Sequence, residues 1–454
     1  LLGMKVVSMY GTGMVCEVIK GGRSANKEGV HVPNVERCRP CISGTDYSDG
    51  WVGIEDGFDF IAASFTRTAD DILQIRKILE EHDCKSVNII AKIENKQGVD
   101  NIDDIIRVSD GIMVARGDMG VEIPMEDVPV IQKILIEKVY KAGKQVITAT
   151  QMLDSMMKHP RPTRAEATDV ANAVYDGTSA IMLSGETAAG DYPVEALQTM
   201  VKIASRTEQD INYMSRLKKR SILTNPDITN AIAHATCTTA MDLNASAIIT
   251  VSNSGRTARM VSKYRPACPI IGCSVNKDVC RKMSLSWGVT PLLVELKHNS
   301  DELFDHAVDK AEEMGLIKQG EIVVLTAGVP LGISGTTNMI KVHVAGHILM
   351  QGKGLNDKVD SGNMCVVNSA EELKEKFKVG DIIVAKDTCN EMMEQIRLSS
   401  GLILEKNSIN CHGAIAGLSL DIPVLIGAEN ATQILKSGAF VTLDGKKGIV
   451  SCNN

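Results

Sequence analysis

The sequence lacks several features that mark particular classes of protein. In 454 residues no apolar run approaches the ~18–20 residues of a membrane-spanning helix, and the first residues lack the layout of a secretory signal peptide. Lys and Arg number 49 against 56 Asp and Glu, so the formal charge is −7 and no basic excess predicts nucleic-acid binding. We therefore expect neither nucleic acid nor membrane as a partner.

The cysteines also lack a recognisable framework. Twelve are scattered along the chain, mostly inside apolar strand or helix patterns. One C-x-x-C occurs, from Cys38 to Cys41, but no second pair and no histidine stands nearby, so a zinc site is not predicted. Free thiols in a reducing cytoplasm are the better interpretation.

Two short apolar runs end in charged residues. They are 87–95, VNIIAKIEN, and 111–118, GIMVARGD. Their β-branched content predicts buried parallel strands. With a period of two, Lys92 and Glu94 share one face of the sheet, and so do Arg116 and Asp118. Two carboxylates and two cations at the carboxyl rim of a sheet predict a Mg²⁺ site that handles phosphate.

The chain alternates strand and helix from about residue 38 to 205, which predicts an α/β fold with a parallel sheet, open or closed into a barrel. Polar residues gather at the strand ends and no Gly-rich turn follows the first strand, so the barrel is favoured. We expect four units. They are an antiparallel stretch at 1–37, the barrel at 38–205, an α/β unit at 206–346 and a third unit at 347–454.

Two hydroxyl-rich loops stand out in the 206–346 unit. Residues 252–257, SNSGRT, lie between a predicted strand and helix, and 332–337, GISGTT, follow another strand. Backbone N–H groups at such a helix start can hold a phosphate. The candidate groups are Ser252, Ser254, Arg256 and Thr257, with help from 334–337. A well-capped strand–helix turn is the alternative interpretation.

Long stretches of the chain closely resemble the pyruvate kinase family. The motifs are IIAKIENKQGV at 89–99, MVARGDMGVE at 113–122, TATQML at 148–153, RPTRAE at 161–166 and MLSGET at 182–187. The resemblance implies a (β/α)8 TIM barrel, a pyruvate kinase α/β C-terminal domain and a swivelling β/α phosphohistidine-like domain. The implied activity is phosphoryl transfer from phosphoenolpyruvate to ADP, giving pyruvate and ATP.

The resemblance also assigns roles to residues. Glu94 and Asp118 are expected to hold Mg²⁺ or Mn²⁺, and Lys92 is expected to neutralise the transferring phosphoryl group. The backbone of Gly117 is expected to hold the substrate carboxylate. Thr150 is expected beside the carbon that is protonated, acting through a relay because its hydroxyl is a poor acid.

Further expectations follow from the same resemblance. Arg116 and Ser184 are expected to support the substrate site, although Arg116 has an alternative role as the partner of a neighbouring carboxylate. The family's K⁺ ligands lie in strands without a counterpart here. A phosphorylated sugar or nucleotide effector and a homotetramer in the cytoplasm complete the expectation.

The sequence departs from the family pattern at its start. About five of the eight barrel strands are found, near residues 58, 89, 112, 146 and 180, and 1–37 resembles only the end of the lid domain. We therefore expect an N-terminally incomplete barrel. Five strands alone would leave two open edges. The resemblance places the family's cation site and its phosphate-binding arginine in the absent strands, and most of the lid is also absent, so we expect the chain by itself to form little pyruvate.

A second departure concerns His412. The family pattern before this histidine is two glycines, an apolar residue, then Thr-Ser-His, whereas residues 407–412 read NSINCH. We therefore expect that His412 carries no phosphoryl group. Three hypotheses remain: a pyruvate kinase polypeptide, a non-catalytic effector-binding sensor, and a phosphotransferase that uses His412. The intact set of Lys92, Glu94, Asp118 and Thr150 favours the first.

Overall fold

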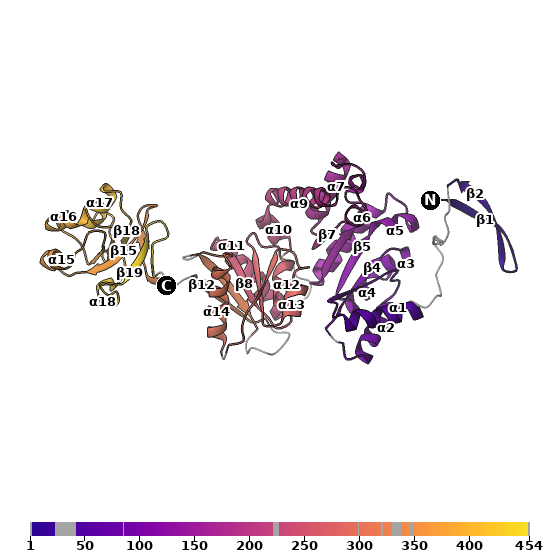
Figure 1. The fold of residues 1–454 in the computed structure, drawn as a ribbon, viewed down its shortest axis with the longest axis horizontal. Coiled ribbons are helices and arrows are strands. Elements are labelled where there is room, and N and C mark those ends of the chain that lie inside the picture. The colour runs from indigo at the N-terminus through magenta and orange to yellow at the C-terminus, as the bar shows by residue number, and fades with distance from the viewer. Residues whose placement is uncertain are drawn as a thin grey trace.

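The protein is described by a computed structural model, which covers residues 2–22, 42–84, 86–220, 227–297, 299–318, 321–328, 337–345 and 348–452. Figure 1 shows a two-stranded hairpin, a helix-covered parallel sheet, a second α/β unit and a C-terminal β-rich unit. In the part of the chain that the structure describes, no helix is both long and apolar enough to span a bilayer.

The hairpin consists of β1 (Gly3–Tyr10) and β2 (Gly13–Lys20), which pair antiparallel as the sequence predicts. The turn uses Gly11 at φ +50°, a left-handed conformation that glycine adopts without a Cβ clash. Large apolar side chains, such as Met9 and Ile19, are exposed along both strands.

The second part is a parallel sheet in the order β3-β4-β5-β6-β7. Its strands are β3 (Phe60–Ala63), β4 (Asn88–Ile93), β5 (Gly111–Ala115), β6 (Gln145–Ala149) and β7 (Ala180–Met182). The predicted five strands and parallel α/β class are therefore confirmed. Among the described strands, β3 and β7 each pair with one neighbour, so both have an open edge.

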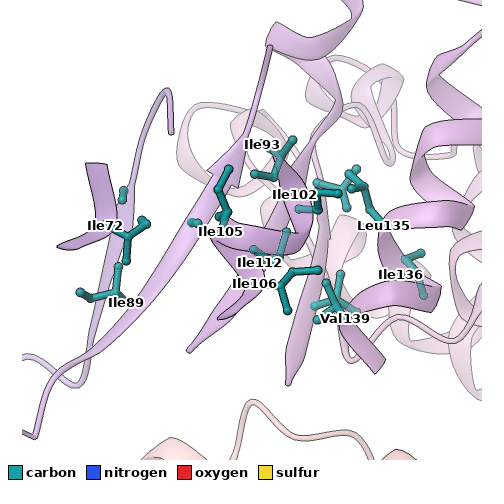
Figure 2. Packing of buried hydrophobic residues seen from close by; sticks show 14 of the residues in the cluster. Ile72, Ile89, Ile93, Ile102, Ile105, Ile106, Ile112, Leu135, Ile136 and Val139 are labelled. Atoms are coloured by element: carbon teal, nitrogen blue, oxygen red, sulfur yellow. The ribbon is translucent and has the colours of Figure 1, made fainter. Parts of the chain in front are cut away.

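Helices cover one face of this sheet. Residues of α2, α4 and α6 pack on that face. The helices of this part of the chain are α1 (Gly44–Glu55), α2 (Ala69–Glu81), α3 (Lys96–Asp100), α4 (Ile102–Val108), α5 (Arg116–Glu122), α6 (Val128–Lys141), η1 (Asp154–Met157), α7 (Arg164–Asp176), α8 (Gly185–Ala188), α9 (Pro193–Asp210) and α10 (Tyr213–Arg220). Figure 2 shows aliphatic side chains of α2, α4 and α6 packed on Ile89, Ile93 and Ile112. The odd-numbered residues of β4 therefore point at the helices, and its even-numbered residues point to the opposite face.

One expectation about the strands was wrong. β5 ends at Ala115 instead of running to Asp118, and α5 begins at Arg116. Ala115 is in register with Ala149, the last residue of β6, so the ladder of β5 with that neighbour stops there. The chain turns into a helix where strand pairing ends, and the two-residue period that placed Arg116 and Asp118 on one face does not apply.

The third part is an α/β unit with sheet order β10-β9-β8-β11-β12, in which β12 alone runs antiparallel. Its strands are β8 (Ala247–Val251), β9 (Ile270–Ser274), β10 (Val289–Leu293), β11 (Ile322–Ala327) and β12 (Met339–Val344). Its helices are α11 (Ile228–Asp242), α12 (Arg256–Lys263), α13 (Lys277–Met283) and α14 (Ser300–Glu313).

This unit closes the amino end of the five-stranded sheet. Leu285 packs on Ile90 and Met113, on the sheet face away from the helices. At the same end, the Gln145 side chain donates to Ser286 Oγ over 2.9 Å. Arg265, 2% exposed, donates to the carbonyl oxygens of Gly177 at 2.8 Å and Thr178 at 3.3 Å.

The C-terminal unit is an eight-stranded sheet with short helices. Its strands are β13 (Ile348–Gln351), β14 (Lys353–Gly354), β15 (Val359–Val366), β16 (Ile382–Ala385), β17 (Gly401–Leu404), β18 (Val424–Ile426), β19 (Phe440–Asp444) and β20 (Ile449–Cys452). Its helices are α15 (Ala370–Lys376), η2 (Asn390–Met392), α16 (Met393–Ile396), α17 (His412–Ser419) and α18 (Ala431–Ile434). Two apolar clusters form its core.

Candidate active site

The carboxyl end of β4 places a lysine and a glutamate on one face of the sheet. Lys92 and Glu94 follow Ile90 at two-residue intervals, so they point away from the helices, as the sequence predicts. Lys92 Nζ lies 2.7 Å from Glu94 Oε1 and donates to Ser64 Oγ over 3.0 Å. The sheet thus gathers a cation, a carboxylate and a hydroxyl at one rim.

The Glu94 carboxylate is fully buried, yet one of its oxygens is not used. Oε2 accepts the Phe65 N–H over 2.5 Å. Oε1 is at ion-pair distance from Lys92 but outside hydrogen-bond geometry, so it has no hydrogen-bond partner. A buried carboxylate oxygen without a hydrogen bond is costly by itself, and a bound cation would satisfy it.

Asp118 lies at the same rim of the neighbouring strand. β4 and β5 are parallel with Ile93 opposite Val114, and Asp118 stands in the first turn of α5, just beyond β5. Its carboxylate is half-buried. In the described chain, no group of three or more His, Cys, Asp and Glu could hold a metal by itself. Two carboxylates fit Mg²⁺, which usually takes one or two carboxylates and completes its shell with substrate and water oxygens.

Thr150 has an unusual backbone next to these groups. Its φ is +70° and that of Gln151 is +53°, although neither is glycine. A β-branched residue in this left-handed region is an outlier, and such strain concentrates at functional sites. Thr150 Oγ1 accepts the Gly117 N–H over 2.7 Å and donates to the Ala149 carbonyl over 2.6 Å.

Packing does not explain why residue 117 is glycine. A Cβ added there would lie 3.4 Å from Thr150 Oγ1, an ordinary contact. Gly117 also needs no left-handed φ, since it does not appear among the glycines with positive φ. Neither a severe clash nor a left-handed backbone therefore requires glycine at this position.

Arg116 lies between α7 and the carboxyl end of β6. Its guanidinium pairs with Asp169 of α7, at 2.7 Å, and its side chain is 10% exposed. It also donates to the carbonyls of Thr150, at 2.6 Å, and Ala149, at 3.3 Å. The alternative interpretation, a partner for a neighbouring carboxylate, therefore describes Arg116. Asp169 was not a candidate from sequence, because nothing in its helical pattern separates it from a solvated carboxylate.

Ser184 lies in the loop that follows β7. Its N–H donates to Glu186 Oε2 over 2.8 Å, and Glu186 Oε1 accepts the Leu153 N–H over 3.0 Å. Glu186 is 2% exposed. This carboxylate therefore ties the loop after β6 to the loop after β7 and places Ser184 at the carboxyl rim.

One contact joins Thr257 of the first hydroxyl-rich loop to Thr337, the last residue of the second. Thr257 Oγ1 lies 2.9 Å from Thr337 Oγ1, and both residues are buried; residues 332–336 lie outside the described residues. Gly255 has φ +69°, and α12 begins at Arg256, which is exposed. Ser254 is exposed, and its N–H donates to Ser252 Oγ over 3.3 Å.

Arg259 of α12 stabilises residues 252–257 through a hydrogen bond. Its guanidinium donates to the Ser254 carbonyl over 3.3 Å. Burial lowers the pKa of Arg259, and the charge of Asp110 acts in the opposite direction. Among the described residues of this loop, Asn253, Ser254 and Arg256 are exposed.

His412 begins α17 in the C-terminal unit, and both of its ring nitrogens have partners. Nδ1 lies 2.7 Å from Thr388 Oγ1, and Nε2 lies 3.0 Å from Asn390 Oδ1. Asn390 Oδ1 can only accept, so Nε2 is the donor in that contact. The ring is fixed within its own unit. The predicted absence of a zinc site at Cys38–Cys41 lies outside the described residues.

Comparisons with known proteins agree with this geometry. Residues 1–197 match the pyruvate kinase barrel domain, 230–343 its alpha/beta domain, and 377–448 the mobile domain of PEP-utilising enzymes. Pyruvate kinases from Bacillus licheniformis and Geobacillus stearothermophilus are each 50% identical over 437 residues, covering 96% of this chain and 74% of the relative. A solved pyruvate kinase from Cryptosporidium parvum has 38% identity and a TM-score of 0.71, over 76% of this chain and 70% of that one.

The βα fold and the lysine–carboxylate rim define a barrel-type phosphotransferase. The matches cover nearly the whole chain and include all three kinds of domain that the sequence predicts. The chain belongs to the pyruvate kinase family.

Proposed function

We propose that this chain transfers the phosphoryl group of phosphoenolpyruvate to ADP, giving pyruvate and ATP. The observation that carries the proposal is the buried Glu94 carboxylate, whose Oε1 has no hydrogen bond although Lys92 Nζ lies 2.7 Å away. A cation and an unsatisfied carboxylate together suit a site for a metal-bound phosphoryl group.

Glu94 and Asp118 would hold Mg²⁺ or Mn²⁺. The metal would supply Lewis-acid stabilisation of the negative oxygens of the substrate. Members of this family generally use Mg²⁺ and K⁺. Glu94 and Asp118 suit the divalent ion. The expectation that K⁺ is also used comes from the family alone.

The remaining groups act on the substrate directly. Lys92 would offset charge on the phosphoryl group during transfer, which is electrostatic stabilisation by a group already in place. The Gly117 N–H would donate to the substrate carboxylate, in exchange for its present bond to Thr150 Oγ1. The released Thr150 hydroxyl would then hydrogen-bond water or substrate and pass a proton to the enol carbon.

The test is Mn²⁺ binding, followed by electron paramagnetic resonance. We expect Glu94→Gln and Asp118→Asn each to weaken Mn²⁺ binding at least tenfold, because each removes one of two carboxylates. Asp110→Asn is the matched control, since Asp110 lies at the amino end of the sheet, where it accepts the Ile89 N–H and pairs with Arg76. Equal affinities in all variants would refute the metal assignment.

Turnover of the chain by itself is expected to be slow. β3, which precedes Ser64, has an open edge in the described residues, and so does β7, which precedes Ser184. Edge strands lack half of their ladder and hold attached side chains less firmly. A coupled assay for pyruvate measures this, and a rate within the usual ~1–10³ per second would contradict it.

We also propose that residues 252–257 bind the phosphate of a sugar or nucleotide effector. Thr337, the last residue of the second loop, contacts Thr257 of the first, and Ser254 and Arg256 are exposed, which supports this proposal. Ser254→Ala and Arg256→Gln are expected to weaken binding of such phosphates in calorimetry while ADP binding stays the same. Unchanged effector affinity in both variants would exclude the site.

The assembly is proposed to be a homotetramer in the cytoplasm. An apolar stripe on α9 supports self-association: Val194, Leu197 and Val201 stand at helical spacing and are 54–61% exposed. Sedimentation of the chain tests this, and Leu197→Lys is expected to reduce the mass of the assembly. A monomer at micromolar concentration would refute the proposal.

A further inference from the structure

We infer that Asp169 and Arg116 form a positioning pair that holds Thr150 in its left-handed conformation and keeps its hydroxyl on the Gly117 N–H. The inference rests on the proposed function, because it concerns the group proposed to deliver the proton. Neither member of the pair touches the proposed substrate site. Both would act through the backbone of residues 149–150.

The guanidinium of Arg116 spans two elements. On one side Nη1 donates to Asp169 Oδ1 over 2.7 Å and, at 3.4 Å, to Gln132 Oε1. On the other side Nη2 and Nε reach the carbonyls of Thr150 and Ala149, at 2.6 and 3.3 Å. A planar fork of donors serves both sides at once, which an ammonium group cannot do with the same geometry.

The conformation that this fork stabilises is unfavourable by itself. Thr150 and Gln151 follow one another with φ +70° and +53°. Each non-glycine residue held this way costs on the order of 1–3 kcal/mol, so the surroundings must over-determine it. Hydrogen bonds to a charged group are stronger than neutral ones, and two of them end on the carbonyls on either side of the Thr150 nitrogen and Cα.

The pair also closes a ring of contacts through the chain. The Arg116 side chain donates to the Thr150 carbonyl. Gly117, which follows Arg116 in the chain, donates its N–H to Thr150 Oγ1 over 2.7 Å. The backbone of Thr150 therefore stays fixed when a substrate carboxylate takes over the Gly117 N–H. The Thr150 hydroxyl then loses its bond to the Gly117 N–H but stays in the same place.

Helix α7 positions Asp169 next to Arg116. The helix starts at a capping box in which Thr163 and Glu166 bond one another's backbone N–H groups. Val170 and Ala173 bury one face of the helix, and Asp169 lies 35% exposed beside them. The Arg116 side chain is only 10% exposed, so its guanidinium has lost most of its water. The negative charge of Asp169 compensates for this loss.

The test measures hydrogen exchange of single amides in the metal-free 454-residue chain. Asp169→Asn is expected to speed exchange of the Gly117 N–H at least tenfold, while the N–H of Val114, in the preceding strand β5, stays within twofold. Asp169→Glu restores the charge and is expected to recover most of the protection. In a Thr150→Val background, Asp169→Asn is expected to add nothing further at Gly117.

Controls separate this role from a general loss of stability. Asp103→Asn is the control, because it also removes an ion-paired carboxylate, in this case the partner of Lys138 at 2.6 Å. It is expected to leave the Gly117 N–H protected from exchange. Parallel acceleration at Gly117 and Val114 would show a merely structural role and overturn the inference, and so would full protection in Asp169→Asn. Mn²⁺ affinity of Asp169→Asn is expected to stay within twofold, so failure of the metal site is detected separately.

Discussion

Arg265 offers a sharp test of how the α/β unit supports the barrel. Its buried guanidinium donates to Gly177 and Thr178 of the barrel unit and to the Ser262 carbonyl, at 3.0 Å, in its own unit. It also lies 4.8 Å from the ring centre of Trp287. We expect Arg265→Ala to loosen the contact between the two units.

The magnitude follows from what the substitution leaves behind. Two barrel carbonyls lose a charged donor, and each buried group left unsatisfied costs about 1–3 kcal/mol. For two carbonyls this gives about 2–6 kcal/mol, and the lost packing on Trp287 adds to it. Arg265→Met keeps the apolar stem and removes the charge that must be desolvated, so it is expected to cost less than Arg265→Ala.

Trp287 supplies the assay. The chain has two tryptophans, and Trp51→Phe leaves Trp287 as the single reporter. Its indole N–H donates to Glu208 over 2.8 Å, across the boundary between the units. In urea, Arg265→Ala is expected to shift Trp287 emission to the red at a lower concentration than the loss of helical circular dichroism. Coincident transitions with the same midpoint as the parent would refute the reasoning.

Three further predictions concern other parts of the chain. Burial raises the pKa of Glu166, but hydrogen bonds from Ser155 and Thr163 outweigh it and leave the pKa lowered. The stabilisation by Glu166 is therefore present above the ordinary carboxyl pKa and is lost as pH falls through the pKa of Glu166 in the folded protein. Glu166→Gln should make the melting temperature fall less steeply with decreasing pH, and an unchanged slope would contradict this. A disulfide reagent should modify exposed Cys389 rapidly and Cys273 only on unfolding, because burial raises the pKa of Cys273 to about 12. Labelled phosphoenolpyruvate should leave no acid-labile label on His412, and label lost in His412→Ala would overturn this.

The sequence predicted the parts of the site that depend on strand periodicity. Lys92 lies in β4 and Glu94 directly follows its last residue, Ile93, so a two-residue period was sufficient to place them together. The same argument failed for Arg116 and Asp118, because β5 stops at Ala115. Where a strand ends depends on its neighbours in the sheet, and a single strand's pattern does not contain that information.

The contacts that the sequence did not predict join residues far apart in the chain. Asp169 lies 53 positions from Arg116, and Arg265 lies 88 positions from Gly177. Their helical and turn patterns also suit solvated charges, so local signals do not separate the two cases. The fold class and the order of domains were predictable because they depend on long periodic stretches and on family motifs.

The closure of the sheet by Leu285 has a consequence for how the chain folds during synthesis. The five strands end at Met182, and the segment that packs on Ile90 and Met113 emerges about a hundred residues later. At translation rates of about 5–20 residues per second, the sheet exists for roughly 5–20 s with its amino end uncovered. A nascent chain stalled before residue 285 should therefore bind chaperones that recognise apolar surface, and one stalled well after the α/β unit should release them.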